Sequence, residues 1–152
     1  MAQTIKLKNS SVAAKVPLLA DLVYGEVALN YADGKIYYKK SDNTIQSIGF
    51  DTVTATTTAT TASQVIATFD ATLYRTVKLI IQSTDATNYH STEILAIHNG
   101  TTASYTEYAT ITIGTVCAVY NVDYSSATVR LLATPTSATS TTYKITAQLT
   151  KI

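Results

Sequence analysis

The chain has 152 residues, of which 46% are apolar and 14% charged, so it holds one ordinary domain, or a small domain with an appendage, and enough apolar residues for a core. Its formal net charge of +1 excludes a strong electrostatic attraction to nucleic acid or to an anionic membrane. No run approaches the roughly 18 apolar residues of a membrane span, and the N-terminus lacks the apolar stretch of a signal peptide, so we expect synthesis in a host cytoplasm and no membrane insertion.

The composition favours β-strands. Thr is the commonest residue, and there are 11 Tyr against two Phe and no Trp. Such β-branched and aromatic side chains pack well on pleated surfaces. The single Cys117 cannot form an internal disulfide, and no Lys, Arg or His beside it lowers a thiol pKa, so we predict a buried core thiol without chemistry.

Residues 1–50 contain the first predicted elements. The alternation in IKLK (5–8) predicts a short strand. The segment KVPLLADLVYG (15–25) predicts one short helix, because Pro17 suits a first helical turn and Gly25 suits the stop.

Residues 26–40 have the pattern of a β-hairpin. Two alternating apolar runs flank Asp33-Gly34, and an Asp-Gly turn of this kind takes positive φ at both residues. A further turn leads to a third strand over 44–49. Such a meander of roughly two dozen residues is too small to be stable alone. We therefore expect it to pair with its copies in neighbouring subunits or to dock on a larger particle.

The segment 51–63, DTVTATTTATTAS, consists almost entirely of Thr and Ala. It predicts either an extended linker or a solvent-facing first strand, because the stiff χ1 of Thr disfavours helix.

Residues 64–152 predict an antiparallel β-sandwich of seven or eight strands without a helix. Several of the strands are apolar on both faces, which indicates a central strand or a second face covered by a partner chain. The expected strands are 64–69, 77–82, 92–98, 105–113, 116–122, 128–133 and 143–150.

The segment 19–49 resembles the N-terminal module of many phage fibre proteins, whose pattern is a short helix, then GE-x-A-x-N, then DGK and an aromatic strand. The matching residues are Leu22, Gly25, Glu26, Ala28, Asn30, Asp33, Gly34, Lys35, Ile36 and Tyr37. Residues 69–111 and 129–149 look like a β-sandwich module common in virion proteins of phages that infect marine bacteria. The resemblance implies a virion appendage, usually trimeric, whose N-terminal module serves attachment or trimer formation.

The function expected from this resemblance is that of a non-enzymatic structural protein of a phage virion. We expect a homotrimeric short tail fibre or fibre-like surface appendage, located in the virion, whose partners are its own copies and capsid, tail or baseplate proteins. The alternatives are a capsid decoration subunit, since the chain lacks a long fibre shaft, or a carbohydrate-binding module that contacts host surface glycans.

The sequence contains few candidates for chemistry. His90, His98 and Glu93 lack the spacing of standard metal ligands. The carboxylates that could serve glycan hydrolysis lie in no recognisable motif; they are Asp70, Glu93, Glu107 and Asp123. We expect no catalytic residue, no metal and no cofactor.

The tyrosines admit two interpretations. Tyr offers a flat apolar body with a polar tip, which suits sugar stacking or protein binding. Because the tyrosines are spread along the chain, we favour places at the rim of the sandwich and at subunit contacts. The candidate surface residues are Tyr89, Tyr105, Tyr108 and Tyr124, with Tyr120 beside them in the sequence. For Lys39-Lys40 we likewise expect a solvated hairpin tip, and the alternative is an anchor on an acidic particle surface.

Overall fold

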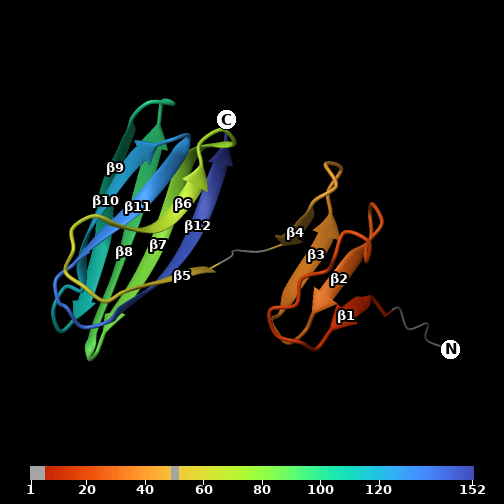
Figure 1. Cartoon of the computed structure of the whole chain (residues 1–152), viewed down its shortest axis with the longest axis horizontal. Coiled ribbons are helices and arrows are strands. Elements are labelled where there is room, and N and C mark those ends of the chain that lie inside the picture. The colour runs from red at the N-terminus through yellow and green to blue at the C-terminus, as the bar shows by residue number, and fades with distance from the viewer. Residues whose placement is uncertain (1–5, 49–51) are drawn as a thin grey trace. The chain divides into compact units, whose positions relative to one another are not determined.

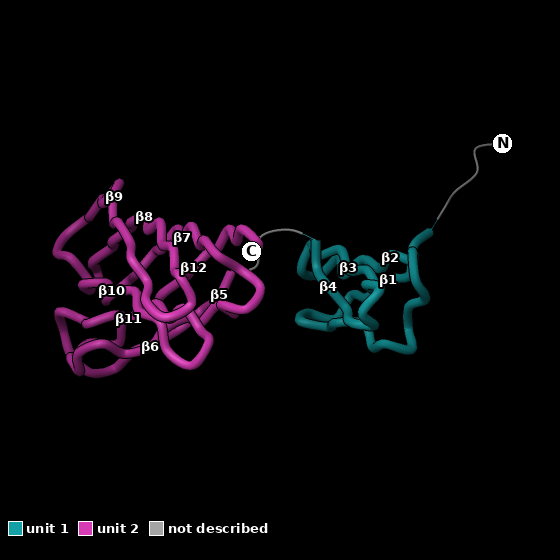
Figure 2. Tube along the Cα trace, turned by 90° about the horizontal axis from the view of Figure 1, so that it is seen from above, with its two compact units in different colours: residues 1–51 teal, residues 52–152 magenta. Residues whose placement is uncertain are grey.

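The computed structural model describes residues 6–48 and 52–152, which contain β-strands and no helix. The chain divides into two compact units, residues 1–51 and residues 52–152 (Figure 2). The all-β class is therefore confirmed, whereas the helix predicted over 15–25 is wrong.

The first unit is one mixed sheet with the strand order β1-β2-β3-β4 (Figure 1). Strand β1 runs parallel to β2, and the other neighbours are antiparallel. The strand predicted over 5–8 lies partly outside the described residues, and β1 begins at its last residue. The strands are β1 (Lys8–Ser10), β2 (Val27–Asn30), β3 (Lys35–Lys39) and β4 (Ile45–Ile48).

Residues 15–25 form turns and irregular backbone, and lysines on the sheet bind two of their carbonyls. Lys8 Nζ lies 2.6 Å from the carbonyl oxygen of Asp21, and Lys39 Nζ lies 3.0 Å from that of Leu19. The Asp21 carboxylate also accepts a hydrogen bond from the Leu18 N–H. Backbone groups that a helix would pair internally are thus taken by side chains.

The turn between β2 and β3 also differs from the prediction. Asn30 pairs with Lys35, so four residues rather than two connect the strands. Gly34 has a φ of +66°, but Asp33 does not have positive φ. The two-residue Asp-Gly turn is therefore wrong, and only Gly34 adopts the left-handed conformation.

The sheet of the first unit buries the smaller side chains of β2. Ala28 and Asn30 are buried, as is Tyr37 of β3, and all three line one cleft together with the buried Leu22. Val27 and Leu29 are only half-buried. The position of the turn segment over the sheet, rather than hydrophobicity, decides which face is buried.

The second unit is an antiparallel sandwich-like pair of sheets, which lie as two layers in Figure 2. One sheet has the order β5-β12-β7-β8-β9, and the other has the order β10-β11-β6. Their strands are β5 (Thr52–Thr57), β6 (Gln64–Asp70), β7 (Tyr74–Asp85), β8 (Asn88–His98), β9 (Ala103–Ile113), β10 (Ala118–Ser125), β11 (Thr128–Pro135) and β12 (Thr141–Lys151).

The Thr-rich segment supplies β5, which pairs with β12 at one edge of the five-stranded sheet. A strand, one of the two alternatives for 51–63, is thus present over Thr52–Thr57, while residue 51 lies outside the described residues. Most of its side chains are exposed.

The core lies between the two sheets of the second unit. Strands β7, β8 and β12 contribute fully buried side chains that meet those of β11. Alternate residues of each strand point inward, as expected for a sheet with one covered face. The largest of these buried side chains are Leu79, Ile81, Ile94, Leu131, Tyr143 and Ile145.

Candidate functional site

The polar centre of the first unit is Asn30, at the end of β2. Its buried side-chain amide donates to the carbonyl oxygens of Val12 at 2.9 Å and Lys15 at 3.0 Å. It also donates to the Asp33 carboxylate at 2.8 Å, and its own oxygen accepts from the Ala32 N–H at 3.0 Å. Because its donors and its acceptor are satisfied, Asn30 is buried without the cost of an unpaired polar group.

Asp33 completes this centre from the β2–β3 turn. The same oxygen that receives the Asn30 amide accepts the Ala14 N–H at 2.7 Å. Ala14 has a φ of +59°, so its N–H points to the carboxylate from a tight turn. Together, Asn30 and Asp33 attach residues 12–15 to the hairpin.

Glu26 fixes the other end of the turn segment. Its carboxylate accepts a hydrogen bond from the Val23 N–H at 3.0 Å and forms an ion pair with Lys8 at 2.8 Å. The hydrogen bond from Lys8, followed by that from Val23, lowers the pKa of Glu26. Gly25, with a φ of +83°, lets the chain turn into β2 just before this carboxylate.

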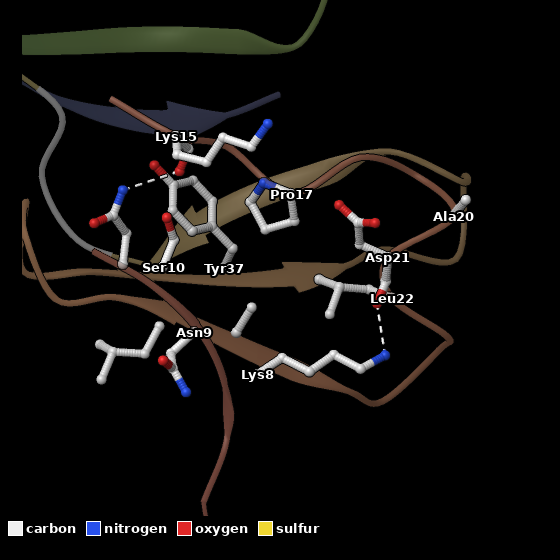
Figure 3. Close-up of a pocket in the computed structure, with 12 residues that line it drawn as sticks. Lys8, Asn9, Ser10, Lys15, Pro17, Ala20, Asp21, Leu22 and Tyr37 are labelled. Carbon is white, nitrogen blue, oxygen red and sulfur yellow. Dashed lines mark hydrogen bonds between the residues drawn. The ribbon is translucent and has the colours of Figure 1, made fainter. Parts of the chain in front are cut away.

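These contacts enclose a cleft of about 570 Å³ between β1, residues 15–22 and the sheet (Figure 3). Leu22, Ala28 and Tyr37 are its buried apolar lining. Lys8 and Lys15 also line it. The cleft thus combines a small apolar floor with cationic side chains.

The residues of the predicted attachment module therefore mostly build the unit from inside. Leu22, Ala28, Asn30 and Tyr37 are buried. Glu26 and Asp33 hold backbone groups, as described above, while Gly25 and Gly34 supply positive φ. Lys35 pairs with Asn30 at the start of β3. Among the matched residues, Ile36 is an exposed large apolar side chain.

Sequence reasoning missed the surface that the same unit displays. Its turn segment holds Leu18 and Val23 at 63% and 68% exposure, and Lys39 Nζ lies 5.2 Å from the centre of the exposed Tyr24 ring. The available signal was the apolar run PLLADLVY, which was assigned to a helix. The exposed large apolar residues are Leu7, Val12, Val16, Leu18, Leu19, Val23, Tyr24, Tyr31, Ile36 and Ile48.

The candidate tyrosines of the second unit do not form one surface. Tyr89 and Tyr108 are exposed on the same face of the five-stranded sheet, since Tyr108 lies opposite Glu93. Tyr105 donates its hydroxyl to the carbonyl oxygen of Tyr120 at 3.2 Å. The half-buried Tyr124 stacks on His98 with ring centres 5.6 Å apart.

The histidines lie apart in different environments. His98 Nε2 is 2.6 Å from the carbonyl oxygen of Tyr74. His90 is buried beside the Tyr120 ring, and neither ring nitrogen has a hydrogen-bond partner in the described part of the chain. Glu93 is on the opposite face of β8 and pairs with Lys78 at 2.9 Å. Within residues 6–48 and 52–152, no three His, Cys, Asp or Glu side chains converge as metal ligands.

The other candidate carboxylates have separate local partners. Asp70 accepts hydrogen bonds from the N–H and hydroxyl of Thr72, which lower its pKa. Asp123 forms an ion pair with Arg130, and the hydrogen bond from Arg130 lowers the pKa of Asp123.

Cys117 is fully buried, as predicted. It lies just before β10 rather than within it, and its Sγ is 3.6 Å from the carbonyl oxygen of Asn88. Within β10, Ala118 and Tyr120 are buried while Val119 is exposed, so Cys117 does not share the face of Val119.

The described part of the chain contains no helix of the length and apolarity that crossing a membrane requires. Comparison of the sequence with protein-family models and with curated proteins finds no match.

Proposed function

We propose that this chain is a non-enzymatic structural subunit of a phage virion, a homotrimeric short fibre or fibre-like surface appendage. The first unit serves assembly or attachment, and the second unit is the outer domain. A capsid decoration subunit is the alternative with the same two parts. The resemblance of residues 19–49 to phage fibre modules supports the phage assignment.

The observation that carries the proposal is the apolar display of the first unit. Many large apolar side chains of this small unit are exposed, and exposed apolar residues that gather into a patch mark interaction sites. The backbone that presents Leu18 and Val23 is held by Asp21, Glu26 and Lys39, so the side chains are displayed on a fixed scaffold. A fixed apolar surface on a very small sheet suits permanent association with copies or with a larger particle.

The acidic side chains of this unit have local hydrogen-bond or ion-pair partners. Asp21, Glu26 and Asp33 are engaged as described, and Asp42 pairs with Lys40 at 2.7 Å. Lys39 binds the Leu19 carbonyl, so the Lys39-Lys40 pair is tied into the unit rather than extended as a free hairpin tip.

Light scattering of the full chain at micromolar concentration tests the assembly. We expect a mass of at least three subunits, and the double change Leu18→Ser with Val23→Ser should reduce it. The matched control is Val119→Ser on β10, because Val119 is 63% exposed but lies in the second unit. A clean monomer with a cooperative melt would show that the proposal is wrong.

Labelled images of purified particles test the location. A copy number near that of the capsid protein indicates decoration, whereas a few dozen copies or fewer indicate a fibre. Absence of the chain from purified particles would refute a virion function altogether.

A second candidate function is binding of host glycans by the second unit. The exposed Tyr89 and Tyr108 on one sheet face support it, since flat aromatic faces stack on sugars. Glycan-array binding that disappears in Tyr89→Ala and Tyr108→Ala would support this function, and an array without signal would contradict it.

A further inference from the structure

Strand β9 is exposed to solvent along almost its whole length. It is an edge strand of the five-stranded sheet, and among the described residues its one paired neighbour is β8. Every residue from Ser104 to Ile113 is exposed, and Ile111 and Ile113 reach 69% and 70%. The outer face of the strand and its free edge are therefore open, while on the inner face Tyr105 donates its hydroxyl to the Tyr120 carbonyl oxygen of β10.

The unequal sizes of the two sheets explain this exposure. The second sheet has three strands against five, so it does not cover the whole inner face of the larger sheet. A long uncovered edge offers a row of unpaired N–H and C=O groups to another strand, and proteins usually block such edges with charges or proline. Strand β9 has no proline and a single charged side chain, Glu107.

A bulge limits how much of β9 can accept another strand. The pairing with β8 shifts between Ser91 and Glu93, and Ala109 has a φ of +55° there. Thr92 is buried at the bulge and donates its hydroxyl to the carbonyl oxygen of Tyr108 at 3.1 Å. Residues 103–108 before the bulge remain a regular strand.

We propose that residues 104–108 of β9 pair antiparallel with the same residues of a second copy across a two-fold axis. The paired strands join two five-stranded sheets into one, and the contact lies in the second unit. It is separate from the assembly surface proposed for the first unit.

The directions of the strands favour a two-fold axis over a ring of sheets. All neighbours in the five-stranded sheet are antiparallel, so its two edges, β5 and β9, point the same way. Joining β9 to β5 of the next copy in a ring around an axis along the strands would pair them in parallel. A two-fold axis instead sets β9 against β9 in the antiparallel arrangement, which is the more stable one and matches the rest of the sheet.

The side chains of β9 suit pairing with themselves. With Thr106 on the axis, the opposite pairs are Thr106 with Thr106, Tyr105 with Glu107 and Ser104 with Tyr108. Thr–Thr pairs across strands are favourable, and the one charge does not face its own copy. A strand from another protein would need a matching sequence to form these pairs, whereas a second copy of β9 already has that sequence.

Disulfide trapping in the full chain tests the axis. In a Cys117→Ala background, Thr106→Cys should form a linked dimer on oxidation, because the residue faces its own copy. Gln148→Cys, exposed on β12 and three strands away from β9 in the same sheet, is the matched control and should stay unlinked. Equal linking of the two variants would overturn the proposal.

A charge at the same position provides a test that keeps Cys117. Thr106→Lys places two like charges on the axis and should halve the mass in solution, while Gln148→Lys should leave it unchanged. An unchanged mass for Thr106→Lys would also overturn the proposal. The side chain is exposed, and circular dichroism checks that the variant folds.

The result also separates this contact from the proposed trimer. If the natural chain has the mass of three subunits and the Thr106→Cys variant stays unlinked, the two-fold contact is contradicted and the trimer is not. If the natural chain has the mass of two subunits and the Thr106→Cys variant is linked, the two-fold contact is supported and the trimer is contradicted. A mass of six subunits with linking supports both, as three-fold and two-fold axes together close a hexamer.

Discussion

The buried side-chain amide of Asn30 donates a hydrogen bond to the carboxylate of Asp33 across 2.8 Å. Through this pair, the hairpin of the first unit holds residues 12–15, since Asn30 binds two of their carbonyls and Asp33 binds the Ala14 N–H. The turn segment with its exposed apolar side chains comes directly after residues 12–15 in the chain. The start of the turn segment therefore depends on two polar residues of the hairpin, while Asp21, Glu26 and Lys39 hold the backbone around Leu18 and Val23.

We expect Asn30→Ala to loosen the turn segment. The change leaves the carbonyls of Val12 and Lys15 without their donor and costs about 1–3 kcal/mol, as for other buried polar groups left unpaired. Amide hydrogen exchange at Ala14 should accelerate, and the mass in solution should fall. Asn9→Ala is the control, because the exposed Asn9 side chain donates only to the nearby Leu7 carbonyl. Unchanged exchange at Ala14 would show that Asn30 does not hold this segment.

We expect Gly34→Val to destabilise the first unit through backbone strain alone. Gly34 has a φ of +66°, and no atom lies within 4 Å of the place that a Cβ would occupy. A β-branched residue in this conformation costs on the order of 1–3 kcal/mol. The variant should lose assembly while thermal unfolding of the second unit stays unchanged. Gly34→Asn, which tolerates positive φ, should keep most of the assembly, and equal losses in both variants would argue against strain.

We expect the second unit to lose stability as the pH falls below about 6.5, the ordinary pKa of histidine. Burial lowers the pKa of His90 in the folded chain, although the negative charge of Glu107 opposes the shift. Below pH 6.5 the unfolded chain binds a proton that the folded chain does not, so the free energy of unfolding decreases until the pH reaches the lowered pKa. The slope is at most about 1.4 kcal/mol per pH unit for one proton.

The variant His90→Phe isolates this contribution. Phe removes both unpaired ring nitrogens, so we expect equal or greater stability at neutral pH and a shallower slope between pH 6.5 and 5. Urea unfolding at several pH values measures both quantities. A slope identical to that of the natural chain would assign the acid sensitivity to other groups.

We expect Cys117→Ala to cost only about 1 kcal/mol, since it removes one sulfur atom from a packed site. Cys117 has no exposed surface, so its thiol should react with a maleimide slowly until the protein is unfolded. The assembly should remain as it is in the natural chain. Rapid labelling of the native protein, or a disulfide between subunits, would place Cys117 at an exposed edge.

The strands of the second unit could be predicted because their signals are local. Alternating β-branched residues mark the centre of each strand, and the predicted 77–82 and 92–98 lie inside β7 (Tyr74–Asp85) and β8 (Asn88–His98). The ends were missed because polar residues such as Thr84 and Asn88 carry no apolar pattern. Across the hairpin, Thr84 pairs with Tyr89 and Asn88 pairs with Asp85, and this pairing places both residues in strands.

The role of the motif residues in attachment or assembly stays a prediction. The residues from Leu22 to Tyr37 lie together in the first unit, where Leu22, Asn30 and Tyr37 are buried. Sequence spacing could not show this, because the burial of Asn30 depends on residues 12–15 folding back over it. The same long-range folding exposes Leu18 and Val23, which the sequence pattern places in a helix.

The sequence by itself determined the all-β class, the residues that form most strands and the burial of Cys117, because strand propensity and turn chemistry act between near neighbours. Tertiary structure alone decided that residues 15–25 form turns, since Lys8 and Lys39 reach them from distant strands. It also decided that β9 is left uncovered, because the exposure of a strand depends on how many strands the opposite sheet contains. Neither the apolar pattern nor the composition of the sequence shows how many strands the opposite sheet contains.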